Sequence, residues 1–280
     1  MTDQKRLNEL RAKIDAIDDE LLALLRSRAD IIEEVRGVKG KQDVYIRPGR
    51  EALMLKALLA KPQGHIPPGL LHRLWREMIG AFTLQEGGFK VAVAQAAGEE
   101  GFWDLSRDHF GGFTPLQVFP NATAALRAVL ARTHQLAALP LPKEGDADCW
   151  WRLLLAPGDE VSKVFYRFPY DGKKGNARAV QHDGVIAGLL APEATGNDIT
   201  VLAVEWQTPG DKRNLTSVIA TLPGVKNHVF IAVGAEPACS WLELEGFLIG
   251  NEGTLKHWQE DNKNHILRYK MIGAYPEPLK

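Results

Sequence analysis

Apolar residues recur every three or four positions along roughly the first forty residues, which is the spacing of one face of an α-helix. No proline interrupts the series, so we predict a helix from Asp3 to Lys41. At 1.5 Å per residue, that helix is about 58 Å long, more than one small domain can cover. We therefore expect it to pair with a second copy of itself. The apolar series consists of Leu7, Leu10, Ile14, Ile17, Leu21, Leu24, Leu25, Ile31, Ile32, Val35 and Val38.

Two shorter helices are expected to follow, over residues 49–61 and 69–86. Pro48 suits the first turn of the earlier one, because a proline there loses no intrahelical hydrogen bond. A stretch rich in proline and glycine separates the two helices. The breaking residues are Pro62, Gly64, Pro67 and Pro68.

Beyond Gly87-Gly88 the pattern changes to short apolar and β-branched runs, which are typical of an α/β arrangement. We divide the chain into a helical domain of residues 1–88, an α/β domain of residues 89–212 and a smaller module of residues 213–280. Helices are expected at 123–133 and 251–261. Strands are expected at 90–94, 135–141, 161–168, 199–205, 215–222, 228–233, 240–248 and 268–270.

The cations of the long helix indicate a site for an anion with two negative groups. At about 100° per residue, Arg28 and Lys39 lie within about 20° of each other, roughly three turns apart on one stripe. Arg11 falls about 100° off that stripe, so it does not easily join them within one chain. In a dimer paired through this helix, Arg11 of the other subunit would reach the pocket. A second charged cluster, Arg47-Pro48-Gly49-Arg50-Glu51, follows the helix.

These residues resemble the all-helical chorismate mutases, the AroQ class. The resemblance implies an intertwined homodimer of three-helix chains whose active site is shared between the subunits. It also implies the pericyclic rearrangement of chorismate to prephenate, with no covalent intermediate, no cofactor and no metal. The likeness is carried by Leu10 to Asp18, Leu21 to Arg28, Val38-Lys39, Arg50-Glu51 and Arg76 to Ala81.

The resemblance also implies roles for individual residues. Arg28, with Arg11 of the partner subunit, would hold the two carboxylates through the planar fork that suits them. Lys39 would reach a carboxylate and the ether oxygen, on which negative charge grows as the C–O bond breaks. Glu51 would accept a hydrogen bond from the ring hydroxyl, and Arg50 would orient Glu51 or shield the pocket. Lys39, Arg28 and the residue at the ether oxygen would be the catalytic ones.

Three positions depart from the family's pattern. Arg47 stands where an acidic residue is frequent, so a contact there would use the backbone, and Phe82 stands where many members have a serine. The glutamine that binds the ether oxygen falls on Glu86, although Gln85 lies beside it. Glu86 must be protonated to donate a hydrogen bond. We therefore expect activity to rise toward mildly acidic pH, and Glu86→Gln to flatten that profile; an unchanged profile would favour Gln85.

The region after residue 88 resembles prephenate dehydratase followed by an ACT-type regulatory module. The Thr-Arg-Phe triplet of the dehydratases falls on Thr200-Val201-Leu202, so a valine replaces the arginine, and the glycine-rich opening of that family is absent. The resemblance therefore implies a dehydratase-like domain that is inactive. The segments that carry the resemblance are Ala138 to Glu144, Trp241 to Phe247 and Ile272 to Pro276.

An ACT-like end implies an aromatic amino acid such as phenylalanine as a feedback ligand. The glycine-rich entry loop of such sites has only Leu222 to Val225 as a candidate. The module is thus either an effector site or a structural relic that supports the dimer. For the whole chain, three alternatives stay open: a bifunctional mutase/dehydratase, an isochorismate-pyruvate lyase on the same helical fold, and a non-catalytic sensor of aromatic metabolites.

Composition excludes some classes of function. The net charge of −1 offers no basic surface for nucleic acid or membrane. Apolar residues make up 45% of the chain, but no 18-residue apolar run or signal peptide is present. Two cysteines, Cys149 and Cys239, are too few for a disulfide framework or a zinc site. We therefore expect a cytoplasmic protein with two free thiols.

Overall fold

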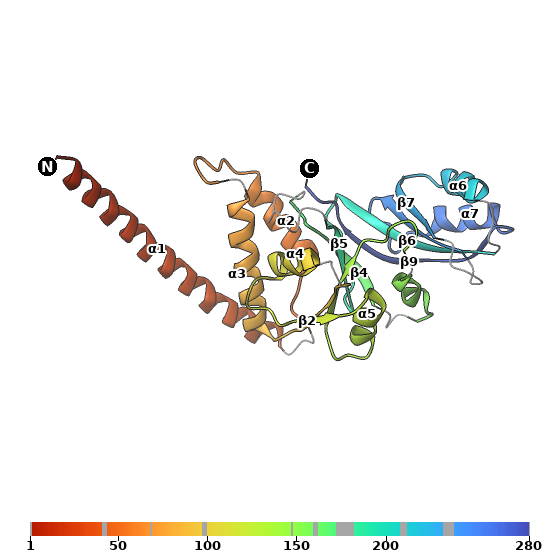
Figure 1. Cartoon of the computed structure of the whole chain (residues 1–280), viewed down its shortest axis with the longest axis horizontal. Helices are drawn as coiled ribbons and strands as arrows, with labels where there is room; N and C mark the ends of the chain where they lie inside the picture. The colour runs from red at the N-terminus through yellow and green to blue at the C-terminus, as the bar shows by residue number, and fades with distance from the viewer. Residues whose placement is uncertain are drawn as a thin grey trace.

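A computed structural model describes residues 2–40, 44–67, 69–96, 100–146, 148–158, 162–171, 182–207, 212–231 and 238–279. Over these residues, a helical region is followed by an α/β region built on a single nine-stranded sheet. Figure 1 shows the first helix extending away from the rest of the molecule. The predicted order of a helical region before an α/β region is confirmed.

The helical region consists of α1 (Thr2–Lys39), α2 (Pro48–Leu59) and α3 (Leu70–Glu86). Pro48 lies in the first turn of α2, as the sequence predicts. Gly69 precedes α3 with φ 79°, a backbone conformation that glycine adopts without strain. The three predicted helices are therefore confirmed, with ends that differ by a residue or two.

The apolar face of α1 is exposed in the single chain. Its C-terminal part packs against α3, whereas the larger part of the helix projects outward (Figure 1). Exposure of these apolar side chains ranges from 37% for Val35 to 89% for Val38. A stripe of this length left in water is unusual for a monomer. The other residues of the stripe are Leu7, Leu10, Ile14, Ile17, Leu21, Leu22, Leu24, Leu25 and Ile31.

The sheet has the strand order β2-β1-β3-β5-β4-β9-β6-β8-β7. β1 runs parallel to β2 and β3, β4 runs parallel to β9, and the remaining pairs are antiparallel. The strands are β1 (Val91–Ala94), β2 (Leu116–Phe119), β3 (Leu136–Pro140), β4 (Lys163–Phe168), β5 (Gly184–Gly188), β6 (Asp198–Trp206), β7 (Val225–Ile231), β8 (Cys239–Glu245) and β9 (Ile266–Pro276). The helices are α4 (Glu100–Phe110), α5 (Ala122–Leu130), η1 (Trp150–Leu155, a 3₁₀-helix), α6 (Lys212–Ala220) and α7 (Gly253–Asp261).

In the N-terminal part of the sheet, strands β1, β3 and β5 are buried, whereas the edge strand β2 is partly exposed. On one face, α5 and η1 contribute to a core that includes the rings of Trp150, Trp151 and Trp241. On the other face, α4 packs together with the helical region, and Leu55 of α2 and Ile79 of α3 belong to the same core as the β1 side chains. The N-terminal helices therefore supply part of the cover of the sheet. The limit at residue 88 and the other predicted domain limits stay predictions.

A close approach between α3 and α4 joins the two regions. A Cβ placed on Gly80 would lie 2.0 Å from the carbonyl oxygen of Phe110. Glu77 accepts a hydrogen bond from the Gly112 N–H at 2.8 Å beside this contact. Only a glycine allows the backbones of the two helices to pack at this distance.

The C-terminal part of the sheet has the topology β6-α6-β7-β8-α7-β9 with strand order β9-β6-β8-β7, a ferredoxin-like βαββαβ unit. The unit begins at Asp198, within the segment that the sequence analysis assigns to the middle domain. The predicted strand at 215–222 is wrong, because α6 occupies most of that segment. The buried side chains there follow a helical spacing that packs one face onto the sheet: Leu215, Val218, Ile219 and Leu222.

Candidate active site

A cavity of about 500 Å³ lies between α1, α2 and α3. Its size falls within the range of about 300–1,000 Å³ that is typical of small-molecule sites. Apolar side chains form much of the wall, and cations and carboxylates face each other across it. The lining residues are Leu24, Ser27, Arg28, Ile31, Ile32, Val35, Tyr45, Arg47, Arg50, Glu51, Met54, Ile79, Phe82, Thr83 and Glu86.

Arg28 reaches the cavity from α1. Its guanidinium carbon lies 4.4 Å from the centre of the Phe82 ring, a distance typical of a cation–π contact. Its Nη1 atom is buried without a hydrogen-bond partner among the described residues. Burial lowers the pKa of Arg28, and the negative charge of Glu86 opposes that shift. A buried cationic donor of this kind suits a carboxylate entering the cavity.

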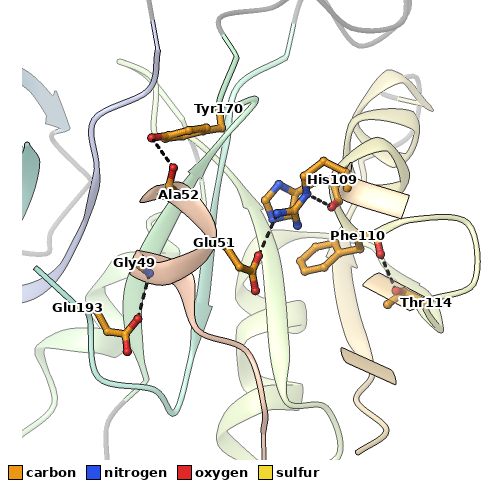
Figure 2. A network of polar contacts seen from close by, with 9 residues as sticks. Gly49, Glu51, Ala52, His109, Phe110, Thr114, Tyr170 and Glu193 are labelled. Carbon is orange, nitrogen blue, oxygen red and sulfur yellow. Dashed lines mark hydrogen bonds and ion pairs between the residues drawn. The ribbon is translucent and has the colours of Figure 1, made fainter. Parts of the chain in front are cut away.

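Glu51 reaches the cavity from the first turn of α2 and is held from behind by a buried arginine. Arg76 is only 3% exposed, and its Nη1 donates to the Glu51 carboxylate at 2.9 Å. The Arg76 Nε donates to the carbonyl oxygen of His109, in α4, at 2.6 Å. Burial raises the pKa of Glu51, while the Arg76 charge opposes that shift. Figure 2 shows Glu51 and His109 on opposite sides of this bridge.

Arg47 and Arg50 flank the start of α2, and both are exposed. The Arg47 Nε donates to one carboxylate oxygen of Glu193, in the segment that follows β5. The other Glu193 oxygen accepts from the backbone N–H of Gly49 at 3.1 Å. The Arg47 side chain thus points to the α/β region, where sequence reasoning predicts only a backbone contact.

Phe82 and Glu86 reach the cavity from α3, one turn apart. Gln85, the alternative to Glu86, is exposed and does not line the cavity. The geometry therefore brings Glu86 rather than Gln85 toward Arg28. Phe82, where many members of the family have a serine, contacts Arg28 here: its ring stacks against the guanidinium.

The structure brings six of the eight predicted site residues to this cavity. Arg11 lies on the exposed part of α1 and does not line it. The side chain of Lys39, at the end of α1, lies outside the described residues. Sequence reasoning assigned no role to Arg76 or Glu193. For Arg76, its spacing of three and four residues from Ile79 and Gly80 was a usable signal, because these positions share the buried face of α3. The six predicted residues that line the cavity are Arg28, Arg47, Arg50, Glu51, Phe82 and Glu86.

The segment expected to match the dehydratase triplet, Thr200-Val201-Leu202, makes structural contacts within the sheet region. The Thr200 hydroxyl donates to the Gly246 carbonyl at 2.7 Å and accepts from the Leu248 N–H at 2.9 Å. Val201 is buried in the same apolar core as Trp241. Both side chains therefore have structural roles in β6. Among the described residues, no group of three or more His, Cys, Asp or Glu could hold a metal ion.

Residues 10–87 match the family model of chorismate mutase type II. The match covers most of the helical region formed by α1, α2 and α3. The cavity lies inside the matched span, so the recognition made from Arg28, Arg50 and Glu51 is confirmed for the domain. None of the helices in the described ranges is long and apolar enough to cross a membrane.

Several curated relatives of this chain are named as bifunctional enzymes, chorismate mutase/prephenate dehydratases. A bifunctional chorismate mutase/prephenate dehydratase of Pseudomonas aeruginosa is 34% identical over 149 residues, which are 50% of this chain. The chain spans 40% of the length of that relative. The aligned stretch is longer than the span of the family model, so the likeness extends beyond the mutase domain.

Two of the solved structures that resemble the chain are prephenate dehydratases. A prephenate dehydratase from Streptococcus mutans has 14% sequence identity and a TM-score of 0.46, covering 69% of this chain and 100% of its own. A prephenate dehydratase from Arthrobacter aurescens, in complex with L-Phe, has 9% identity and a TM-score of 0.47, covering 68% and 92%.

Proposed function

We propose that this protein is a chorismate mutase, which rearranges chorismate to prephenate in the cavity between α1, α2 and α3. One observation carries the proposal: three helices bring Arg28, Glu51 and Glu86 to the wall of one cavity of about 500 Å³. Arg50 adds a further cation at its exposed side. The family match over residues 10–87 supports the same reaction.

The proposed chemistry needs no nucleophile. Arg28 binds one carboxylate of the substrate, and its stacking on Phe82 limits the orientations of the guanidinium. Glu51, held by Arg76, accepts a hydrogen bond from the ring hydroxyl. Lys39, and Glu86 in its protonated form, serve as donors to the ether oxygen, where negative charge grows in the transition state. Donors fixed at that atom bind the transition state more tightly than the ground state, which accelerates the reaction.

We propose a homodimer paired through α1. The exposed apolar stripe from Leu7 to Val38 supports this assembly, because pairing would remove it from water. Arg11 of one subunit would then complete the cavity of the other, as a second cation for the dianion. We also infer a cytoplasmic location, since the two cysteines are free thiols.

We infer that the α/β region has no dehydratase activity of its own. The hydroxyl of Thr200 is engaged by Gly246 and Leu248, and Val201 carries no charge to hold a carboxylate. The βαββαβ unit of residues 198–276 is our proposed site for an aromatic amino acid such as phenylalanine. A structural relic is the other interpretation, and addition of phenylalanine to the assay distinguishes the two.

The deciding experiment incubates the full chain separately with chorismate, prephenate and isochorismate, followed by chromatography of the three substrates and of phenylpyruvate, salicylate and pyruvate. We expect chorismate to be converted to prephenate and prephenate to stay intact. Phenylpyruvate formation would establish the bifunctional enzyme. Inert chorismate together with salicylate and pyruvate formed from isochorismate would establish the lyase, and inertness toward all three would leave a sensor.

A further inference from the structure

Residues of the α/β region hold the first turn of α2, which carries Arg50 and Glu51. Glu193 accepts from the Gly49 N–H at 3.1 Å and from the Arg47 side chain. The Tyr170 hydroxyl, beyond β4, donates to the Ala52 carbonyl at 3.3 Å. Figure 2 shows Glu193 and Tyr170 approaching this turn, with Glu51 pointing away toward His109.

The Glu193 contact replaces a cap that the local sequence lacks. The first N–H groups of a helix have no intrahelical partner and are usually satisfied by a neighbouring side chain. Arg47 occupies the N-cap position of α2 and makes no side-chain capping bond. Glu193 supplies the acceptor from 144 positions beyond Gly49 in the chain. Its negative charge also suits the positive end of the helix dipole.

Gly49 allows this contact to be close. A Cβ at this position would lie 2.7 Å from the Cβ of Glu193 and 3.3 Å from its carbonyl oxygen. Gly49 is buried, and Glu193, in the segment after β5, contacts it at the start of α2. The two regions therefore meet through the backbone as well as through one ion pair.

We propose that Glu193 is a positioning residue for the mutase site: by holding Gly49 and Arg47, it fixes Arg50 and Glu51 at the cavity. This inference rests on the proposed mutase function. It gives the α/β region a role in the reaction that is independent of any dehydratase chemistry. Glu193 does not line the mutase cavity, so its effect passes through the turn of α2.

Replacement of Glu193 would remove both a negative charge and a positioning contact, and these two losses have opposite expected effects on substrate binding. Glu193 is an anion close to a site for a dianion, so loss of its charge alone would strengthen substrate binding. Loss of positioning would weaken binding and slow the reaction, because Arg50 and Glu51 would no longer point at the substrate. A lower folded fraction would reduce the apparent kcat and leave KM unchanged. An increase in KM is therefore the informative readout.

The experiment compares full-chain Glu193→Ala and Glu193→Asp with Glu260→Ala, a control at an exposed glutamate of α7. For Glu193→Ala we expect KM for chorismate to rise about threefold and kcat/KM to fall about tenfold, the effect of losing a charge-assisted hydrogen bond. Glu193→Asp keeps the charge but shortens the side chain, so a smaller rise in KM, about twofold, is expected. The control should match the wild type.

Hydrogen exchange of residues 48–55 provides a second readout that needs no activity. Faster exchange there in both Glu193 variants, together with the increased KM, is the expected result. Unchanged exchange, unchanged KM or a decreased KM would each overturn the proposal. If Glu193→Ala does not fold, Glu193→Asp decides by the same two measurements. A wild-type protein inert toward chorismate would instead refute the mutase function, while exchange would still report whether Glu193 holds α2.

Discussion

Arg76 and Glu51 form a buried ion pair at 2.9 Å beneath the proposed mutase cavity. Arg76 also donates to the His109 carbonyl at 2.6 Å, so one guanidinium connects α2, α3 and α4. Burial of Glu51 raises its pKa, and the Arg76 charge counteracts this. The carboxylate proposed to accept from the substrate therefore depends on a residue that does not line the cavity.

Replacement of Arg76 by leucine should destabilise the fold strongly. The substitution leaves the Glu51 carboxylate and the His109 carbonyl without their donor, and breaking a buried pair in this way costs about 3–5 kcal/mol. Urea unfolding measures this loss. Arg73→Leu is the control, because Arg73 is 57% exposed and pairs with Asp108 at 3.3 Å; a surface pair contributes about 1 kcal/mol or less. Equal stability of the two variants would contradict the buried bridge.

Gly80→Ala should separate α3 from α4. At a solvent-exposed position of a helix, this substitution would stabilise the helix by up to about 1 kcal/mol. At Gly80, however, the new Cβ would lie 2.0 Å from the Phe110 carbonyl oxygen. We expect a net loss of about 1–3 kcal/mol, the usual cost of overpacking. Gly37→Ala is the matched control, since Gly37 also lies in a helix, α1, and its Cβ position has nothing within 4 Å among the described residues. Thermal unfolding compares them, and equal melting temperatures would argue against the close packing.

Stability should fall as the pH is lowered below about 6.5, the usual pKa of histidine. Burial lowers the pKa of His109 well below this value, and nearby Arg76 and His72 charges add to that effect. The unfolded chain therefore binds a proton that the folded chain does not, which favours unfolding at acidic pH. The raised pKa of Glu51 acts in the opposite direction, but it is present in every variant compared.

His109→Phe should flatten this dependence. The imidazole packs among the rings of Phe110, Tyr166 and Phe168, so an apolar ring suits the position. Urea denaturation between pH 7.5 and 5 measures the free energy of unfolding. We expect the slope of that free energy against pH to be smaller than in the wild type, by up to about 1.4 kcal/mol per pH unit. An exposed histidine serves as the control, His65→Phe. A slope that is the same in both variants would count against a buried, neutral His109.

Glu86→Gln should raise mutase activity at neutral pH and remove the rise expected toward acidic pH. A glutamine donates to the ether oxygen at every pH, whereas an ionised glutamate only accepts hydrogen bonds. Removal of an ether-oxygen donor is expected to slow turnover about 100- to 1,000-fold, so Glu86→Ala should lose that much at acidic pH. The pH profile of kcat measures both effects. Gln85→Ala is the control, because Gln85 is exposed.

Mixing two inactive variants should restore activity if the site is shared between subunits. Arg11→Ala and Arg28→Ala each remove one cation from every site, but a heterodimer of the two contains one intact site. Random pairing would then return about a quarter of the wild-type activity, since half of the dimers are mixed and each has one good site. Turnover of chorismate after joint unfolding and refolding measures this. No gain above the separate variants would contradict the shared site.

The helical region was predictable because helices obey a local rule. These elements are indicated by neighbours a few positions apart: the spacing of apolar residues in α1, the proline in the first turn of α2 and the prolines before α3. The same rule predicted that Arg28 belongs to an anion site, whereas Glu86 was assigned to the site by the family resemblance alone. It failed at α6, where β-branched residues suggested a strand and the helical spacing of Leu215, Val218 and Ile219 decided the outcome.

The amino-acid sequence by itself determined the three helices, the family that the helical region resembles and six residues of the cavity wall. Only the tertiary structure decided that these helices share a core with the sheet, that Arg76 holds Glu51 and that Glu193 caps α2. The physical reason is distance along the chain. The Glu193 and Tyr170 contacts join residues more than 100 positions apart, and no local periodicity encodes which distant group satisfies a free N–H or carbonyl.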